Sequence, residues 1–400
     1  MKIVMFKRNI QFRNHILRSF TPYCIFDVVL KKAMQGVDSR DVRVWDPAPD
    51  MVPYWDGKRP VKNMLVMSGG GAGDRVQITP GFRKLYKTLG NKPFDVCSDV
   101  HEEWDNLPYV AVRHPWIPRY ELLQNYDAVC SFEDVLGKDN ERTTHLAELF
   151  AERLFVAPLW PGTSAQDPGE LKCDWAWGEG ELERCAYIAP KPDGAQWVAL
   201  QWESHGKSRN WPVENAVVLS VMLATRPNTL VLLIGSRGQG PQWAWPVYGS
   251  EHILPDPVEN VVNLCGQFET LRQLAAFLTR CDLLIAPDSG PLHVAGALGI
   301  PSIGLYGPHT YETRGRYFPT QRPSFLVDDT DDRCPCYTHA DQQDEPIPCG
   351  EQCCKLMASI TPAHVFKVAT EVLDAQLTQQ DVRPPQPKSK RVRKCADVGC

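Results

Sequence analysis

Two runs of short apolar segments that alternate with helical segments constrain the fold of this 400-residue chain most strongly. In the first run, strands are predicted at Met64–Met67, Phe94–Cys97, Tyr109–Val112 and Ala128–Cys130, and helices at Thr79–Leu89 and His145–Phe155. In the second, strands are predicted at Trp197–Gln201, Thr229–Ile234, Val261–Leu264, Asp282–Ala286 and Ile300–Tyr306, and helices at Val213–Ala224, Leu271–Thr279 and Leu292–Leu298. Short apolar strands between helices are typical of parallel sheets covered by helices on both faces. The sequence therefore predicts an α/β protein with two doubly wound domains.

Irregular segments divide the chain into five predicted parts. The boundaries follow a Pro- and Asp-rich connector at 45–60, a loop rich in Pro, Gly and Trp at 156–193, and a Pro-rich basic end. We expect an amino-terminal extension at 1–60, a first domain at 61–192, a second domain at 193–360, a helix at 361–380 and a disordered basic tail at 381–400.

Composition narrows the class of protein. The formal charge of −5, from 43 basic and 48 acidic residues, argues against nucleic-acid binding through bulk positive charge. No apolar run approaches the roughly 18–20 residues that span a bilayer. The first 20 residues carry five Lys or Arg but no continuous apolar core or small-residue cleavage site. These features predict a soluble, intracellular protein of the cytoplasm.

A glycine-rich turn follows the first predicted strand. The segment MLVMSGGGAGDRVQITPGFRKL at 64–85 places Gly70, Gly71 and Gly73 before Asp74. Its spacing fits neither a dinucleotide-binding fingerprint nor a P-loop. A carboxylate beside such open space could act as a general base. It could equally cap the following helix, which is a common role for Asp.

A second turn, at 288–293, has the pattern of an anion site. The residues Asp288-Ser-Gly-Pro-Leu-His293 join a predicted strand to a small-residue helix. Backbone N–H groups at Ser289, Gly290 and the next residues would point out of the helix start, where the helix dipole favours phosphate. His293 would add a hydrogen bond or charge to that anion, or would be a packed core histidine.

Cations follow the first strand of the second domain. Lys207 and Arg209 precede Trp211-Pro212, which opens a helix. They complement the anion that the turn at 288–293 would hold, although a solvated charged loop is the ordinary alternative.

These segments together resemble the family 9 glycosyltransferases, the heptosyltransferase-like group with a GT-B fold. The likeness lies in MLVMSGGGAGDRVQITPGFRKL at 64–85, SRNWP at 208–212 and, most specifically, DSGPLHVAGALGIPSIGLYGP at 288–308. It covers roughly residues 55 to 375. The resemblance implies two Rossmann-like domains that face each other across a central cleft, with the nucleotide sugar on the second.

The resemblance also implies roles for the residues above. Asp74 would be the general base that deprotonates an acceptor hydroxyl, so the family likeness favours base over cap. Arg209, with Lys207, would contact the donor's diphosphate, and Asp288, Ser289, Gly290 and His293 would line the phosphates and nearby sugar. The reaction would invert configuration and need no metal or other cofactor for catalysis.

The sequence leaves the donor base and the acceptor open. The usual Arg or Lys of the family's first strand is replaced here by the run Ser68–Gly71, and no acid for a ribose follows Ile234. The acceptor would be a carbohydrate, a protein or a nucleic acid. The alternatives are a phage-type transferase acting on a modified nucleic-acid base, a non-catalytic nucleotide-sugar binder, and a sugar-nucleotide epimerase.

Five of the 14 cysteines crowd into one insertion, at 334–354. Cys334, Cys336, Cys349 and Cys353 form a C-x-C…C-x₃-C pattern that could hold a structural zinc ion. Disulfides and free buried thiols are the alternatives. The basic residues of the tail between Lys388 and Lys394 would either solubilise the chain end or hold a polyanionic acceptor.

Overall fold

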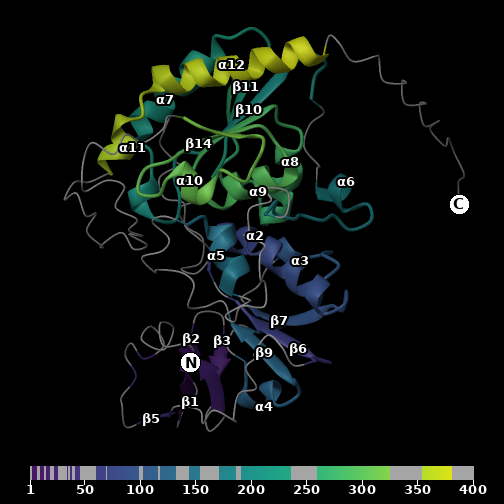
Figure 1. Cartoon of the computed structure of the whole chain (residues 1–400). Helices are drawn as coiled ribbons and strands as arrows, with labels where there is room; N and C mark the ends of the chain where they lie inside the picture. Colours follow the sequence, from purple (N-terminus) through teal and green to yellow (C-terminus); the bar gives the residue numbers. More distant parts are fainter. Residues whose placement is uncertain are drawn as a thin grey trace, which may run out of the picture.

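The computed structural model describes most of two α/β units and short pieces of the amino-terminal segment. The described residues are 2–6, 10–12, 15–18, 22–25, 34, 37, 41–45, 60–68, 70–98, 102–115, 118–131, 144–153, 171–185, 191–235, 259–324 and 354–380. In Figure 1 the first unit lies in the lower half of the molecule and the second in the upper half.

The second unit contains a six-stranded parallel sheet with the strand order of a nucleotide-binding fold. Across the sheet the strands are β12 (Val261–Asn263), β11 (Thr229–Leu233), β10 (Gln196–Leu200), β13 (Leu283–Pro287), β14 (Ser302–Leu305) and β15 (Gln321–Pro323). Numbered along the unit, this order is 3-2-1-4-5-6, and every pair is parallel. The order reverses between β10 and β13, and in such sheets ligands bind at the carboxyl ends of the strands flanking that point.

Helices cover both faces of this sheet, because successive strand residues point to opposite sides. Val198 and Leu200 pack against α7 (Val213–Ala224) and α12 (Pro362–Gln380). Trp197 and Ala199 face the other way, toward α8 (Leu271–Leu278) and α9 (Gly290–Leu298). Figure 1 shows α12 along the outer side of the upper half.

The first unit repeats the design with four parallel strands. Their order is β8 (Val110–Pro115), β7 (Phe94–Ser98), β6 (Met64–Met67) and β9 (Ala128–Ser131). Here the order reverses between β6 and β9. One face packs on α3 (Thr79–Thr88) and α5 (Leu146–Arg153), and the other on α4 (Tyr120–Leu123).

The amino-terminal segment contains strands that the sequence does not predict. β1 (Lys2–Phe6) pairs antiparallel with β4 (Pro22–Ile25) and β5 (Val42–Trp45), while β2 (Ile10–Phe12) and β3 (His15–Leu17) form a hairpin. These strands are only three to five residues long, too short for the alternation of side chains to give a clear period.

The predicted elements of both α/β runs are confirmed to within two residues at most ends. The structure adds α2 (Ala72–Gln77), α10 (Tyr311–Arg314), α11 (Lys355–Ser359), α6 (Glu181–Cys185) and two short 3₁₀ helices, η2 (Glu102–Trp104) and η4 (Lys207–Arg209). The predicted tail and the cysteine pattern at 334–353 lie outside the described residues. Among the described residues no helix is both long and apolar enough to cross a membrane.

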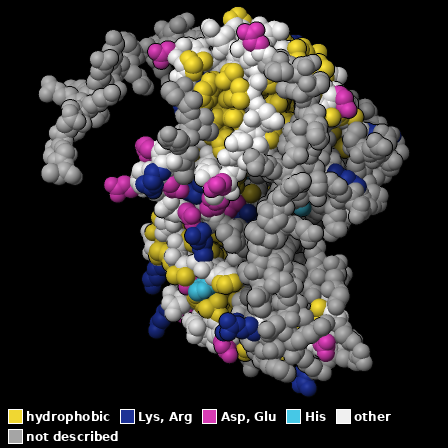
Figure 2. All heavy atoms as spheres, turned by 180° about the vertical axis from the view of Figure 1, so that it is seen from behind, with side chains coloured by type: hydrophobic (Ala, Val, Ile, Leu, Met, Phe, Trp, Pro, Cys, Tyr) yellow, Lys and Arg dark blue, Asp and Glu magenta, His cyan; other side chains and the backbone are white. Residues whose placement is uncertain are grey.

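The two units meet through helices of both, at the narrow middle of the molecule. In Figure 1, α2 and α5 of the lower half lie beneath α9 and α10 of the upper half. Arg272 of α8 donates to Glu181, to the Glu102 carbonyl oxygen at 2.8 Å and to the Ala176 carbonyl oxygen, and its guanidinium lies 5.0 Å from the ring centroids of Trp175 and Trp177. Figure 2 shows acidic and basic side chains intermixed at this level.

Phe82 is the aromatic centre of the first core. Its ring lies 5.1 to 6.2 Å, centroid to centroid, from Phe94, Trp104 and Tyr109, and it is fully buried. We expect Phe82→Ala to lower the free energy of unfolding of this unit by about 3–5 kcal/mol, because a large cavity replaces these contacts. Urea denaturation checks this. Val112→Ala, at a side chain of the same unit that is 49% exposed, should change this free energy by no more than about 0.5 kcal/mol. Equal effects of the two variants would contradict this account of the core.

Candidate active site

The two sheets bring three loops to the same region. The turn at 70–74 follows β6, the loop at 201–209 follows β10, and the turn at 288–290 follows β13. Each loop leaves the carboxyl end of a strand next to the point where its sheet reverses order. α2 and α9, which start from the first and third loops, pack against each other. The sequence-predicted site residues of both units therefore converge on one place.

The glycine turn is shorter than the sequence predicts. α2 begins at Ala72, so Gly73 and Asp74 are already helical, and the predicted helix from Thr79 is a second helix, α3. Ile78 joins the two helices, and Pro80 stands in the first turn of α3, where its missing N–H costs nothing. Gly70 has φ +94°, and a Cβ there would lie 2.8 Å from the Asp74 carboxylate, so glycine is required at this position.

Asp74 caps the start of α2 in this structure. Its Oδ2 accepts a hydrogen bond from the Gly71 N–H at 2.7 Å, and its side chain is half-buried. The cap holds the carboxylate in the first turn of α2, the helix that packs against α9. A carboxylate that accepts a hydrogen bond from a helix start can also accept a proton from a hydroxyl. The observed cap therefore leaves the base role of Asp74 open.

Asp288 is a buried carboxylate surrounded by cations. It is 3% exposed, and its Oδ1 accepts from His293 Nε2 at 2.9 Å. Its Oδ2 lies 3.7 Å from Arg209, 3.9 Å from Arg314 Nε and 4.0 Å from His309 Nδ1. Arg209 also donates to the Asp288 carbonyl oxygen at 2.9 Å. Asp288 thus organises four side chains from three segments of the second unit.

These neighbours decide the ionisation of Asp288. Burial alone would raise its pKa, but the hydrogen bond and charge of His293, followed by Arg209 and His309, outweigh burial and hold the pKa of the carboxyl well below its usual range. Arg209 and Arg314 thus lie within 4 Å of the same carboxylate oxygen. Arginine is a common ligand of phosphate, so this edge of the sheet is a candidate site for an anion.

His293 contacts both units. Its Nε2 bonds Asp288, and its Nδ1 lies 3.1 Å from Gln77 Nε2 of α2. The Gln77 amide nitrogen also lies 3.4 Å from His293 Nε2, so the amide packs against the ring, and Nε2 is assigned as the donor to Asp288. The contact of His293 with a bound anion stays a prediction.

The other predicted donor-site residues surround the start of α9. Ser289 is its N-cap and donates from Oγ to Gln201 Oε1 at 2.9 Å. Gly290 is its first residue, and a Cβ there would lie 2.9 Å from Ala72 Cβ, so α2 covers this helix start closely. Arg209 Nε is buried without a hydrogen-bond partner. Lys207 lies half-buried in η4, two residues before Arg209.

Sequence reasoning misses five polar residues of this region. They are Gln77, Gln201, Glu203, His309 and Arg314. Gln77 and His293 are 216 positions apart and no local pattern marks the pair. Burial raises the pKa of Glu203 to about 7, so the loop after β10 holds a carboxyl that titrates near neutrality. The cation pattern Arg314-Gly-Arg316 after the predicted strand at 300–306 is the one signal that could have pointed to Arg314.

No metal centre is found among the described residues, which contain no cluster of three or more His, Cys, Asp or Glu side chains suited to one. The predicted zinc ligands Cys334, Cys336, Cys349 and Cys353 lie outside these residues, so structural zinc stays a prediction.

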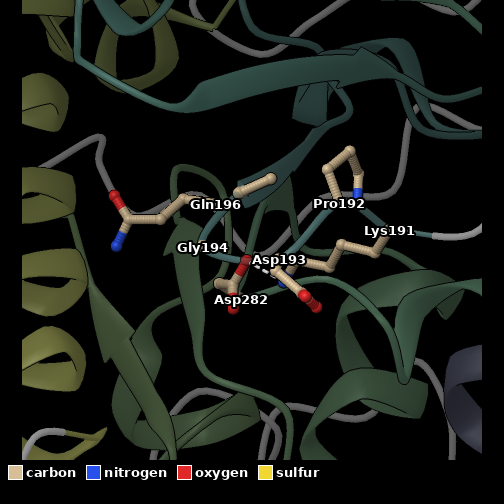
Figure 3. A pocket seen from close by; sticks show the side chains of 7 residues that line it. Lys191, Pro192, Asp193, Gly194, Gln196 and Asp282 are labelled. Carbon is tan, nitrogen blue, oxygen red and sulfur yellow. Dashed lines mark hydrogen bonds and ion pairs between the residues drawn. The ribbon is translucent and has the colours of Figure 1, made fainter.

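A separate hollow lies at the opposite, amino edge of the second sheet. It is lined by Lys191, Pro192, Asp193, Gly194, Ala195, Gln196 and Asp282, just before β10 and β13 (Figure 3). Lys191 and Asp282 pair with each other there. Ligands of such sheets bind at the carboxyl edge, so this hollow is not the donor site.

Known proteins resemble this chain in sequence over its second unit and in fold over most of its length. Residues 181–331 match the model of glycosyltransferase family 9 (heptosyltransferase). Lipooligosaccharide heptosyltransferase 2 of Haemophilus influenzae is 33% identical over 106 residues, which are 26% of this chain and 28% of that protein. The aligned stretches cover 17% to 48% of the curated relatives' own lengths.

Two solved structures share the fold. A family 9 glycosyltransferase from Veillonella parvula aligns with a TM-score of 0.59 at 16% identity, over 78% of this chain and 98% of its own. The ADP-heptose lipopolysaccharide heptosyltransferase II of E. coli aligns with a TM-score of 0.58 at 17% identity, over 80% and 100%. The chain therefore has the GT-B arrangement of two Rossmann-like units, as the sequence predicts.

Removing the charge of Asp288 should unbalance the buried cations. We expect Asp288→Asn to lower the free energy of unfolding at pH 7 by about 3–5 kcal/mol, the cost of breaking one side of a buried ionic cluster. Calorimetric unfolding measures it. Asp193→Asn, at an exposed acid, is the matched control and should be nearly neutral.

The same substitution should change the acid dependence of stability. The depressed pKa means that Asp288 stabilises the fold fully above about pH 4, its unfolded value, and that this contribution is lost as pH falls through the folded pKa. Asp288→Asn should therefore lose less stability than wild type between pH 4 and lower values. Acid denaturation of both proteins measures this. If their free energies of unfolding fall equally as pH is lowered, the assigned ionisation of Asp288 is wrong.

Proposed function

We propose that this chain, whose residues 181–331 match the model of glycosyltransferase family 9, transfers a sugar from a nucleoside-diphosphate sugar to an acceptor hydroxyl. One observation supports the proposal: α2, the helix that carries Asp74, packs against α9, which starts two residues after Asp288 and its cationic neighbours. A transferase needs these two parts together, one acting on the acceptor and one holding the donor. A protein that only binds the donor has no use for the first.

The cationic site would hold the donor's diphosphate. Arg209 has a buried Nε without a partner, and the start of α9 directs its first N–H groups outward, as helix starts do. Ser289 and Gly290 form that helix start. Lys207, two residues before Arg209, would approach the same phosphates. These groups stabilise the negative charge that develops on the leaving diphosphate.

Asp74 would be the general base. In the reaction, the acceptor hydroxyl gives its proton to the Asp74 carboxylate as its oxygen bonds to the anomeric carbon. The bond from that carbon to the diphosphate oxygen breaks, and the leaving nucleoside diphosphate takes the electron pair. Attack from the face opposite the leaving group inverts the configuration. One base suffices for this single displacement, and the arginines supply the positive charge.

The relatives indicate which donor and acceptor to test first. The names of the curated proteins that match are those of heptosyltransferases of lipopolysaccharide or lipooligosaccharide. The aligned E. coli structure is that of an ADP-heptose enzyme. We therefore propose an ADP-linked heptose as the donor and a saccharide hydroxyl as the acceptor, and release of nucleoside diphosphate from a panel of sugar donors tests this choice.

Two substitutions separate the base role of Asp74 from its cap role. Asp74→Asn keeps an oxygen that can accept from the Gly71 N–H but loses basicity, so turnover should fall by about 10²–10⁴-fold with little change in stability. Asp74→Ala also loses the cap and should in addition lose about 0.5–2 kcal/mol of stability. Nucleoside diphosphate release and thermal unfolding measure the two effects. Near-normal turnover of Asp74→Asn would remove Asp74 as the base.

Arg209 should contribute strongly to donor binding. We expect Arg209→Gln to weaken binding of ADP by about 10- to 100-fold, the range of a charge-assisted contact, as measured by isothermal titration calorimetry. Arg226→Gln is the control, because Arg226 pairs with Asp374 of α12 and not with Asp288. The same affinity in both variants would place the diphosphate elsewhere.

A further inference from the structure

We propose that Gln77 is a positioning residue: through His293 it locks the helix that carries Asp74 onto the loop that holds the donor. The inference rests on the proposed function for its kinetic consequence. The lock itself is a contact between two side chains and can be measured without turnover.

The first support is a line of buried polar contacts that joins the two units. Gln77 Nε2 lies 3.1 Å from His293 Nδ1 and 3.4 Å from His293 Nε2, and that Nε2 lies 2.9 Å from Asp288 Oδ1. Gln77 is 0% exposed, and His293 and Asp288 are each 3% exposed. Water does not replace a lost partner at such depth, so each of these contacts restricts the arrangement of its neighbours.

The second support is the fit of the backbone around the His293 ring. A Cβ on Gly73 would lie 2.5 Å from His293 Cδ2, so the ring rests directly on the α2 backbone. Gln77 lies one turn further along α2, and its amide nitrogen contacts the same ring. The ring is therefore fixed by a steric contact on one side and by a hydrogen bond on the other.

The consequence for catalysis comes from the spacing on α2. Asp74 and Gln77 are three residues apart, so they lie on neighbouring turns of one face of the helix. Fixing Gln77 against His293 sets the rotation and translation of α2 relative to α9. It thereby sets the distance from Asp74 to a sugar held at the start of α9. Displacement of a reacting group by about 1 Å can lower a rate by about 100-fold.

The kinetic test compares Gln77→Met with wild type. Methionine has a similar length and no strong donor or acceptor, so it should keep the packing and lose the lock. We expect kcat to fall by about 10-fold or more, while the affinity for ADP, set by Arg209 and Ser289, changes by less than about 3-fold.

A double-mutant cycle tests whether the two residues act as one unit. If they do, Gln77→Met combined with His293→Asn should be no slower than His293→Asn alone. The control is Gln124→Met, the same substitution at an exposed position of the first unit, which should leave kcat unchanged. An unchanged kcat in Gln77→Met, or independent multiplicative losses in the double variant, would overturn the proposal.

Nuclear magnetic resonance of ¹⁵N-labelled histidine tests the contact between Gln77 and His293 independently of the proposed function. In wild type the His293 ring should show a protonated Nε2, which bonds Asp288, and Gln77→Met should shift the Nδ1 resonance, because it removes the amide nitrogen that lies 3.1 Å from this atom. An unchanged Nδ1 resonance would overturn the lock itself. A shifted resonance in a protein that turns over no sugar donor would uphold the lock and reject the transferase.

Discussion

The buried negative charge of Asp288 is the constraint on which the site depends. A carboxylate excluded from water must be balanced by nearby cations, and the chain supplies them from the loop after β10, from α9 and from the region of α10. Asp288 therefore fixes how these segments sit around the carboxyl edge of the sheet. Through His293 it also reaches Gln77, so the balance of charge in the second unit extends to the placement of the first.

Much of the fold was predictable from the sequence because parallel strands buried on both faces give continuous apolar runs. Leu283–Pro287 and Met64–Met67 are buried along their whole length, and both stand out in the sequence. Turn chemistry located the ends: Gly299, with φ +73°, terminates α9 as a helix-ending glycine does. The helix α2 was missed because its glycines indicate a turn and because it is only six residues long.

The candidate site was predictable only where its residues are neighbours in sequence. Asp288, Ser289 and His293 share one turn, and Arg209 precedes a recognisable Trp-Pro pair, so each could be named from local pattern. Gln77, His309 and Arg314 could not, because their meaning comes from contact with a segment far away in the chain. The local pattern also predicts that His293 contacts the anion, whereas its contacts with Asp288 and Gln77 could be known only from the structure.

The close approach of Gly73 to the His293 ring has an evolutionary consequence. The volume at position 73 and the volume at position 293 share one space, since a single added carbon would overlap the imidazole. Neither position can change freely while the other is kept. A lineage that acquires a side chain at position 73 must also acquire a smaller or differently oriented side chain at position 293. Asp288 would then lack the hydrogen bond that His293 donates to it.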